Sequence, residues 1–309
     1  MTPEIWTVLL ILNKFLVYLG IAGAIGGCIN MFLFTNRDVS ITRYDVIRQW
    51  QIKNAKYALL FIVIGFIANF VDFFVQTGNL SETGLAGMFE PVMLNMMWVS
   101  SVGTMTIVRA QGLALSGAMM LYMLLKSTSL QSYAQGLGFI FLSFWIISTL
   151  SYSFTLSGHT NTLTLGSITL ISLHVAMGFA WLGSLLPLIY ATYVFDDKEL
   201  HILMHRFGTY ASWGVAILLA VGIVMLFQLV PSIDLLLSSP YGQLFMLKIL
   251  FVLVLLLFAI LHKFLLVPRI LQQSTGRATL RYSVIGEAFI ALFVLVSTSV
   301  VTTAVGPIT

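Results

Sequence analysis

The sequence predicts an all-α, polytopic membrane protein with eight transmembrane helices. Of its 309 residues, 59% are hydrophobic and only 8% are charged, whereas soluble domains have about 25% charged residues. Apolar runs long enough to cross a bilayer as helices recur along the chain, while barrel strands would alternate apolar and polar residues. This composition excludes an ordinary soluble enzyme, a disordered protein and a disulfide scaffold.

Eight segments meet the requirement of about 20 predominantly apolar residues for a spanning helix. The expected spans are 5–34, 57–77, 102–125, 134–157, 164–194, 207–230, 241–265 and 283–305. The first is too long for the apolar region of a signal peptide, so we expect it to be retained. The longest loop is residues 35–56, so we expect residues 1–309 to form a single integral membrane domain.

The basic residues predict the orientation of the spans. Twelve of the fifteen Lys and Arg residues fall in the loops after spans one, three, five and seven: Arg37, Arg43, Arg48, Lys53, Lys56, Lys126, Lys198, Arg206, Lys263, Arg269, Arg277 and Arg281. The intervening loops, 78–90, 158–163 and 231–240, contain no Lys or Arg. Because basic loops stay in the cytoplasm, both termini are expected on the opposite, periplasmic side. The net charge of +4 reflects these loops and gives no reason to expect a nucleic-acid partner.

The two halves of the sequence share one plan, which indicates a parallel duplication of four-helix units. Gly103 and Gly242 each follow serines at the start of a span, and each is followed six residues later by a base, Arg109 or Lys248. Four spans per half return the chain in the same orientation, a repeat arrangement found in transporters. The expected pseudo-repeats are residues 1–157 and 158–309.

Five charged residues fall inside the expected spans: Lys14, Asp72, Arg109, Lys248 and Glu287. A charge at membrane depth costs at least ~2.5–3.5 kcal/mol, and such residues often mark a pathway. Alternatively they pair structurally, Arg109 and Lys248 with Asp72 and Glu287, or the long bases extend to an interface. Glu287 lies about one turn inside the last span, where its short side chain reaches less far. Both interpretations stay open for these residues.

Two histidines suggest a metal site near the outer side of the membrane. His159 ends the fourth span and His174 lies in the fifth, with only a short loop between the two spans. His174, Met177 and Trp181 recur at helical spacing and share one face of their helix. Imidazole and thioether ligands suit copper, and the thioether favours Cu(I). The alternative is a buried His174 that donates a hydrogen bond to a backbone carbonyl.

The remaining histidines are less informative. His201 and His205 are spaced i, i+4 on a short cytoplasmic segment, which is either a metal-binding pair or a solvated helix face. His262, next to Lys263, is expected at the inner interface. The single cysteine, Cys28, lies in an apolar run, which excludes a disulfide framework and a thiolate-cluster metal site.

The fourteen methionines offer further soft ligands. Met93, Met96 and Met97 lie just before the third span on the outer side, and share a face if that segment is helical. We regard them as a possible copper relay. Methionine also fills gaps in apolar cores, and this is the preferred interpretation for methionines within the spans.

An ordered set of short motifs resembles the copper resistance protein D (CopD) family. The set comprises Gly158-His159, Leu173-His174, Trp181-Leu182-Gly183-Ser184-Leu185, Arg206-Phe207, Tyr241-Gly242 with Lys248, and Glu287. The resemblance implies an eight-span protein of the bacterial inner membrane that handles copper from the periplasm. It also implies His159 and His174 as copper ligands with Trp181 beside them, and a separate periplasmic CopC-like copper-binding partner.

We therefore expect a copper transporter rather than an enzyme, with a copper ion bound by His159, His174 and Met177. The expected direction is from the periplasm toward the cytoplasm. Trp181, Asp72, Arg109, Lys248 and Glu287 would line a pathway or serve the structure. The alternative function is a membrane haem protein for redox chemistry, with His159 and His174 as axial ligands. A structural subunit without a ligand is a third possibility. The sequence shows no Walker-type phosphate loop, so direct use of ATP is not expected.

Overall fold

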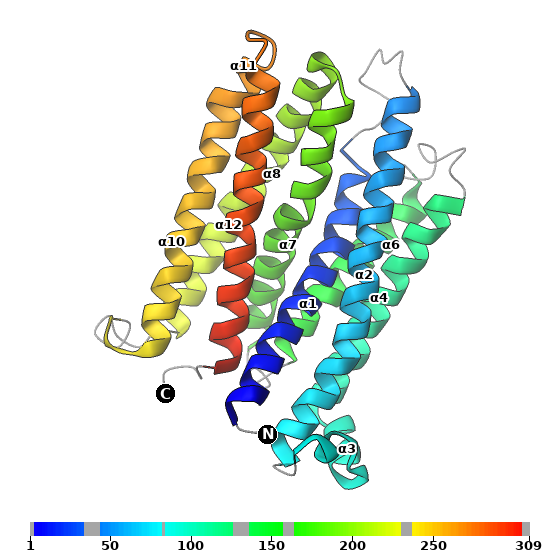
Figure 1. Cartoon of the computed structure of the whole chain (residues 1–309), viewed down its shortest axis with the longest axis vertical. Helices are drawn as coiled ribbons and strands as arrows, with labels where there is room; N and C mark the ends of the chain where they lie inside the picture. Colours follow the sequence, from blue (N-terminus) through cyan, green and yellow to red (C-terminus); the bar gives the residue numbers. More distant parts are fainter. Residues whose placement is uncertain are drawn as a thin grey trace.

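Eight long helices run side by side through the protein (Figure 1). The computed structural model describes residues 3–33, 44–81, 84–125, 136–156, 164–229 and 237–304. Within these ranges the long helices are α1 (Pro3–Asn30), α2 (Tyr44–Ser81), α4 (Ser101–Leu125), α6 (Leu137–Tyr152), α7 (Leu165–Val194), α8 (Asp197–Leu229), α10 (Pro240–Leu261) and α12 (Gly276–Ala304). Together with short continuations of α6 and α10, they give eight segments long and apolar enough to cross a membrane. The predicted all-α fold with eight spans is confirmed.

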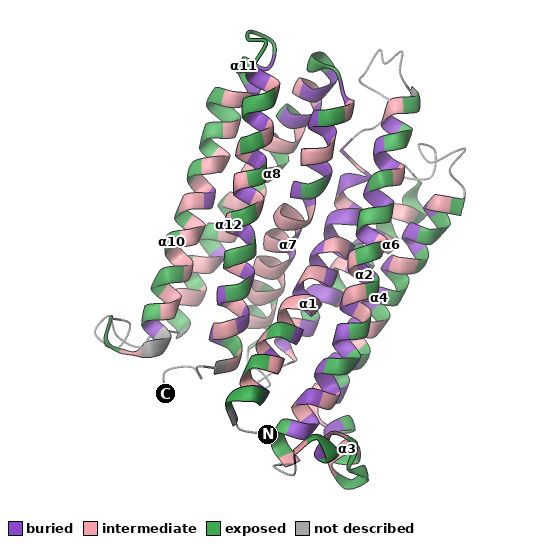
Figure 2. Ribbon diagram, in the orientation of Figure 1, coloured by how far each residue is buried: buried purple, intermediate pink, exposed green. Residues whose placement is uncertain are grey.

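The helices pack as two groups, which are joined mainly through α1 and also by contacts of α6 and α2 with α7 (Figure 1). The first group is α1, α2, α4 and α6, and the second is α7, α8, α10 and α12. Helix α1 contacts α7 and α12 of the second group as well as its own neighbours. Burial is deepest along α1, whereas α8 and α10 are mostly exposed or half-buried (Figure 2). The second group is therefore the more open of the two.

The start of α1 and the end of α12 lie at the same end of the bundle (Figure 1). The ammonium of Lys14 on α1 donates to the carbonyl oxygen of Thr302 on α12 at 2.9 Å. The hydroxyl groups of Tyr18 and Thr302 lie 3.4 Å apart. This arrangement suits an even number of spans, while the periplasmic placement of this end and the duplication stay predictions.

Three helices begin earlier than the sequence indicated. Helix α8 begins at Asp197 rather than at 207, and α2 and α12 also begin early. The predicted loop 35–56 and span 57–77 are corrected because α2 already begins at Tyr44. Trp50 is fully buried there, and its indole N–H donates to the carbonyl oxygen of Pro187 at 2.9 Å. Likewise α12 begins at Gly276 rather than at 283, and the guanidinium of Arg281 stacks over the ring of Tyr193 at 3.8 Å. Tertiary contacts thus extend α2 and α12 beyond their apolar segments.

Gly183 allows the two groups to approach closely. A Cβ atom placed on it would overlap the carbonyl oxygen of Ala22, and the backbone of Gly26 lies directly opposite. Pro187 follows four residues later and has no N–H, so the Gly183 carbonyl lacks its usual helical donor. The side-chain amide of Asn30 approaches that oxygen at 3.5 Å. The Gly183 position of the Trp-Leu-Gly-Ser motif is therefore where α1 and α7 join.

Candidate functional site

Glu287 on α12 is the centre of a hydrogen-bonded chain of side chains, which links α12 to α7 and to the end of α10. This carboxylate lies on α12 and is 2% exposed. Its Oε1 accepts a hydrogen bond from Nε1 of Trp181 on α7 at 2.8 Å. Its Oε2 lies 3.2 Å from Nδ1 of His262, and Nε2 of His262 lies 2.8 Å from the hydroxyl of Ser283. The buried carboxylate is thus held from two sides.

The structure corrects the expectation that His262 is simply interfacial. Its side chain is only 14% exposed and faces Glu287. His262 begins a π-helical turn, η4 (His262–Leu266), that links α10 to α11 (Val267–Arg269). Pro268 follows and lacks the N–H that in a regular helix would donate to the carbonyl oxygen four residues earlier, which accounts for an altered turn here. Turns of this type are frequent at functional sites.

His174 lies on α7, is half-buried, and faces α8. Its Nδ1 atom is buried and has no hydrogen-bond partner among the residues that the structure describes. A Cβ atom on Gly222 of α8 would lie 3.5 Å from Cε1 and 3.7 Å from Nδ1 of this ring. Gly222 therefore leaves room beside the imidazole. Because buried polar atoms are almost always hydrogen-bonded, this nitrogen is available to a ligand, while the backbone of Leu218 on α8 also acts on the ring as a hydrogen-bond partner.

Met177 faces the same neighbour one turn further along α7. Its Sδ atom lies 3.5 Å from the position of a Cβ atom on Gly214 of α8. The predicted shared face of His174 and Met177 therefore packs on α8, and a glycine of α8 lies opposite each side chain. This places an imidazole and a thioether at one helix interface.

Lys248 lies on α10 and is half-buried. Its ammonium is close enough to act electrostatically on the His174 imidazole. A positive charge there opposes the binding of a second cation at His174. The suggested pairing of Lys248 with Glu287 is wrong, because the basic partner of that carboxylate in the described structure is His262.

In the first helix group, Asp72 lies on α2 and Arg109 lies on α4. Arg109 is 4% exposed, donates from Nε to the hydroxyl of Ser153 at 3.2 Å, and lies 5.0 Å from the ring centre of Phe154. Asp72 accepts a hydrogen bond from Gln76 at 2.6 Å, while its Oδ1 is buried without a partner. The described residues contain no ion pair between Asp72 and Arg109.

The other predicted site residues are only partly brought together. His159 lies outside the described residues. The methionines do lie on a helix, α3 (Pro91–Trp98), but Met97 is buried, Met96 is 51% exposed and Met93 is intermediate. The rings of His201 and His205 stack with centroids 6.1 Å apart on α8. In the described ranges no three His, Cys, Asp or Glu side chains gather closely enough to hold a metal, so a copper site there would need methionine or another donor.

Comparison with known proteins identifies the C-terminal part of the chain. Residues 201–301 match the CopD family, described as Copper resistance protein D. The predicted resemblance is thereby confirmed for this segment, which includes Gly214 and Gly222 of α8, and also Lys248, His262 and Glu287. The description of the matched family concerns copper resistance. No curated protein and no solved structure matches the chain.

Proposed function

We propose that this multi-pass protein carries copper across the bacterial inner membrane, from the periplasm toward the cytoplasm, with His174 and Met177 as ligands inside the bundle. The observation that carries the proposal is the buried, unpaired Nδ1 of His174. The thioether of Met177 lies at the same interface with α8, and a nitrogen–sulfur ligand pair suits copper. The CopD match over α8, α10 and α12 supplies the link to this metal.

Further copper ligands would lie on the periplasmic side of the membrane. In this proposal His159 completes the site, because it lies in the short stretch of sequence between α6 and α7. Met93, Met96 and Met97 would collect copper beforehand, and Met96 is exposed enough to meet it first. A CopC-like periplasmic protein would deliver the metal.

The inner side of the second group would receive the ion. Glu287 and His262 offer a carboxylate and an imidazole 3.2 Å apart, and both are competent copper ligands. Lys248 weakens retention at His174 by charge repulsion. Transport requires binding that is weak enough for release as well as favourable enough for entry, so this lysine would keep the ion from being trapped.

Copper accumulation in cells tests the proposal. Cells that produce the His174→Ala or Met177→Leu variant should accumulate at least fivefold less copper than cells with the unchanged protein at equal expression. Met246→Leu is the matched control, since Met246 is 41% exposed on α10 and should have no effect. Unchanged accumulation in the His174→Ala cells would favour a structural subunit.

The absorption spectrum of the protein tests the alternative function as a haem protein. The purified protein is expected to show no Soret absorption band. A Soret band that disappears in the His174→Ala variant would replace copper transport by a haem protein that uses this histidine as an axial ligand.

A further inference from the structure

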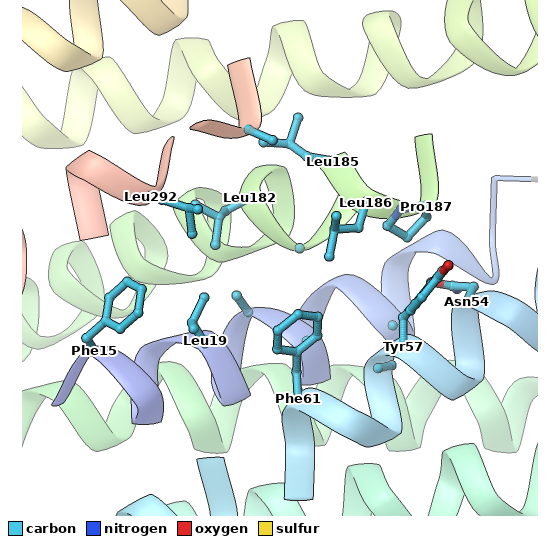
Figure 3. A pocket seen from close by; sticks show the side chains of 16 residues that line it. Phe15, Leu19, Asn54, Tyr57, Phe61, Leu182, Leu185, Leu186, Pro187 and Leu292 are labelled. Atoms are coloured by element: carbon cyan, nitrogen blue, oxygen red, sulfur yellow. The ribbon is translucent and has the colours of Figure 1, made fainter. Parts of the chain in front are cut away.

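An apolar groove separates α1 and α2 from α7 and α12 (Figure 3). Its volume is about 290 Å³, and it is lined mainly by aromatic and aliphatic side chains, among them Phe15, Leu19, Phe61, Leu182, Leu186 and Leu292. Leu186 is 43% and Leu292 is 38% exposed. The groove therefore opens toward the outside of the helix bundle, which in a membrane is lipid.

One end of the groove is polar. Asn54 and Tyr57, both on α2, lie together there (Figure 3). Asn54 is only 2% exposed, and within the described part of the chain its side-chain Nδ2 has no hydrogen-bond partner. Tyr57 is 36% exposed, and its ring packs edge-on against Tyr190 of α7. The apolar groove thus ends at a buried amide donor that lacks an acceptor.

Two lysines adjoin the residues of this polar end in the sequence. Lys53 and Lys56 neighbour Asn54 and Tyr57 on α2, and both side chains are exposed. Within the described residues neither forms an ion pair with a carboxylate. The loop before α2 is among the basic loops, so the distribution of charges assigns this end to the cytoplasmic side. A negatively charged group would be complementary to this rim.

The length of the groove fits one leaflet of a bilayer. Along α1 the lining extends from Phe15 to Gly27. Twelve helical residues rise about 18 Å, and half of the hydrocarbon core of a bilayer measures about 15 Å. A single acyl chain that enters at the cytoplasmic interface would fill the groove along its length.

We propose that the groove binds an anionic phospholipid of the cytoplasmic leaflet. One acyl chain lies between the two helix groups, and an ester carbonyl of the lipid accepts a hydrogen bond from Asn54. The phosphate lies beside Lys53 and Lys56. The lipid thereby fills the opening between α2 and α7, next to the close contact of Gly26 with Gly183. This inference is independent of the proposed copper site.

Native mass spectrometry of the full chain in mild detergent tests the proposal. Phosphatidylglycerol and phosphatidylethanolamine serve as the anionic and zwitterionic probes. The unchanged protein should retain one phosphatidylglycerol per chain, and at least fivefold less phosphatidylethanolamine. Lys53→Gln combined with Lys56→Gln should reduce phosphatidylglycerol retention at least fivefold. Asn54→Leu should reduce retention of both lipids.

Two further variants keep the test decisive. Lys198→Gln with Arg269→Gln removes two exposed charges from the same side of the bundle and should leave retention unchanged. Ala288→Phe places a ring in the groove and should exclude the lipid even if Asn54→Leu does not fold. Equal retention of both lipids, equal loss in the control pair, or an isoprenoid quinone found in place of the phospholipid would overturn the proposal.

Discussion

The indole N–H of Trp181 donates to the carboxylate of Glu287 at 2.8 Å and joins α7 to α12 within the second helix group. The same carboxylate is paired with His262 at 3.2 Å. The tryptophan of the Trp-Leu-Gly-Ser motif is thus held in place by Glu287 of the last helix. The two residues are 106 positions apart in the sequence, so the contact depends entirely on the fold.

Replacement of Glu287 by Ala should destabilise the protein by about 1–3 kcal/mol, because the buried N–H of Trp181 would lose its acceptor. Glu287→Gln should cost less, since the amide oxygen can still accept from Trp181 although the charge opposite His262 is lost. Thermal unfolding in detergent, followed by tryptophan fluorescence, measures the order. Equal melting temperatures for Glu287→Ala and the unchanged protein would contradict this role.

A side chain at Gly183 should separate the two helix groups. A Cβ atom there would overlap the carbonyl oxygen of Ala22 on α1, so Gly183→Ala should cost about 1–3 kcal/mol as an overpacked contact. Gly208→Ala is the control on α8, since nothing lies within 4 Å of the added atom. If the two variants gave equal thermal stability in detergent, the close contact of α1 with α7 would be refuted.

Gly222 controls the space beside His174. The position of an added Cβ atom lies 3.5 Å from the ring, an ordinary contact, so Gly222→Ala should fold and bind copper normally. Gly222→Leu should fill the space at Nδ1 and reduce copper binding at least fivefold while the protein still folds. Copper binding by purified, folded variants measures this. Full binding by Gly222→Leu would show that the ion does not approach His174 from α8.

Removal of the positive charge near His174 should strengthen copper binding. Lys248→Met eliminates the repulsion that the ammonium exerts at the imidazole, and we expect about tenfold tighter binding, which corresponds to about 1.4 kcal/mol. Release, and therefore transport in cells, should slow. Lys198→Met, an exposed lysine at the start of α8, should leave the affinity unchanged. Weaker binding by Lys248→Met would instead make this lysine a ligand or a structural support.

The fold class follows from the sequence because apolar length is the requirement of the bilayer itself. The apolar runs identified all eight spans. They could not show that α2 starts at Tyr44, because its first turns carry polar and basic residues. That extension depends on the burial of Trp50 against α7, a contact between segments distant in the chain.

The candidate site was only partly predictable for a similar reason. Helical spacing placed His174, Met177 and Trp181 on one face, and in the structure His174 and Met177 both face α8, opposite Gly222 and Gly214, respectively. The role of His262 was missed, because its neighbour Lys263 suggested an interface. Its contact with Glu287 joins the end of α10 to α12, and only Pro268, which follows the irregular π-helical turn, gave a local signal that the segment is unusual.

X-ray absorption of the copper-loaded, purified protein tests the proposed ligands most directly. The spectrum of the unchanged protein should contain both imidazole nitrogen and thioether sulfur in the copper coordination shell. Met177→Leu should remove sulfur scattering, His174→Ala should reduce the imidazole contribution, and Met246→Leu should change neither. Identical spectra for the unchanged protein and the His174→Ala variant would contradict a copper site at His174.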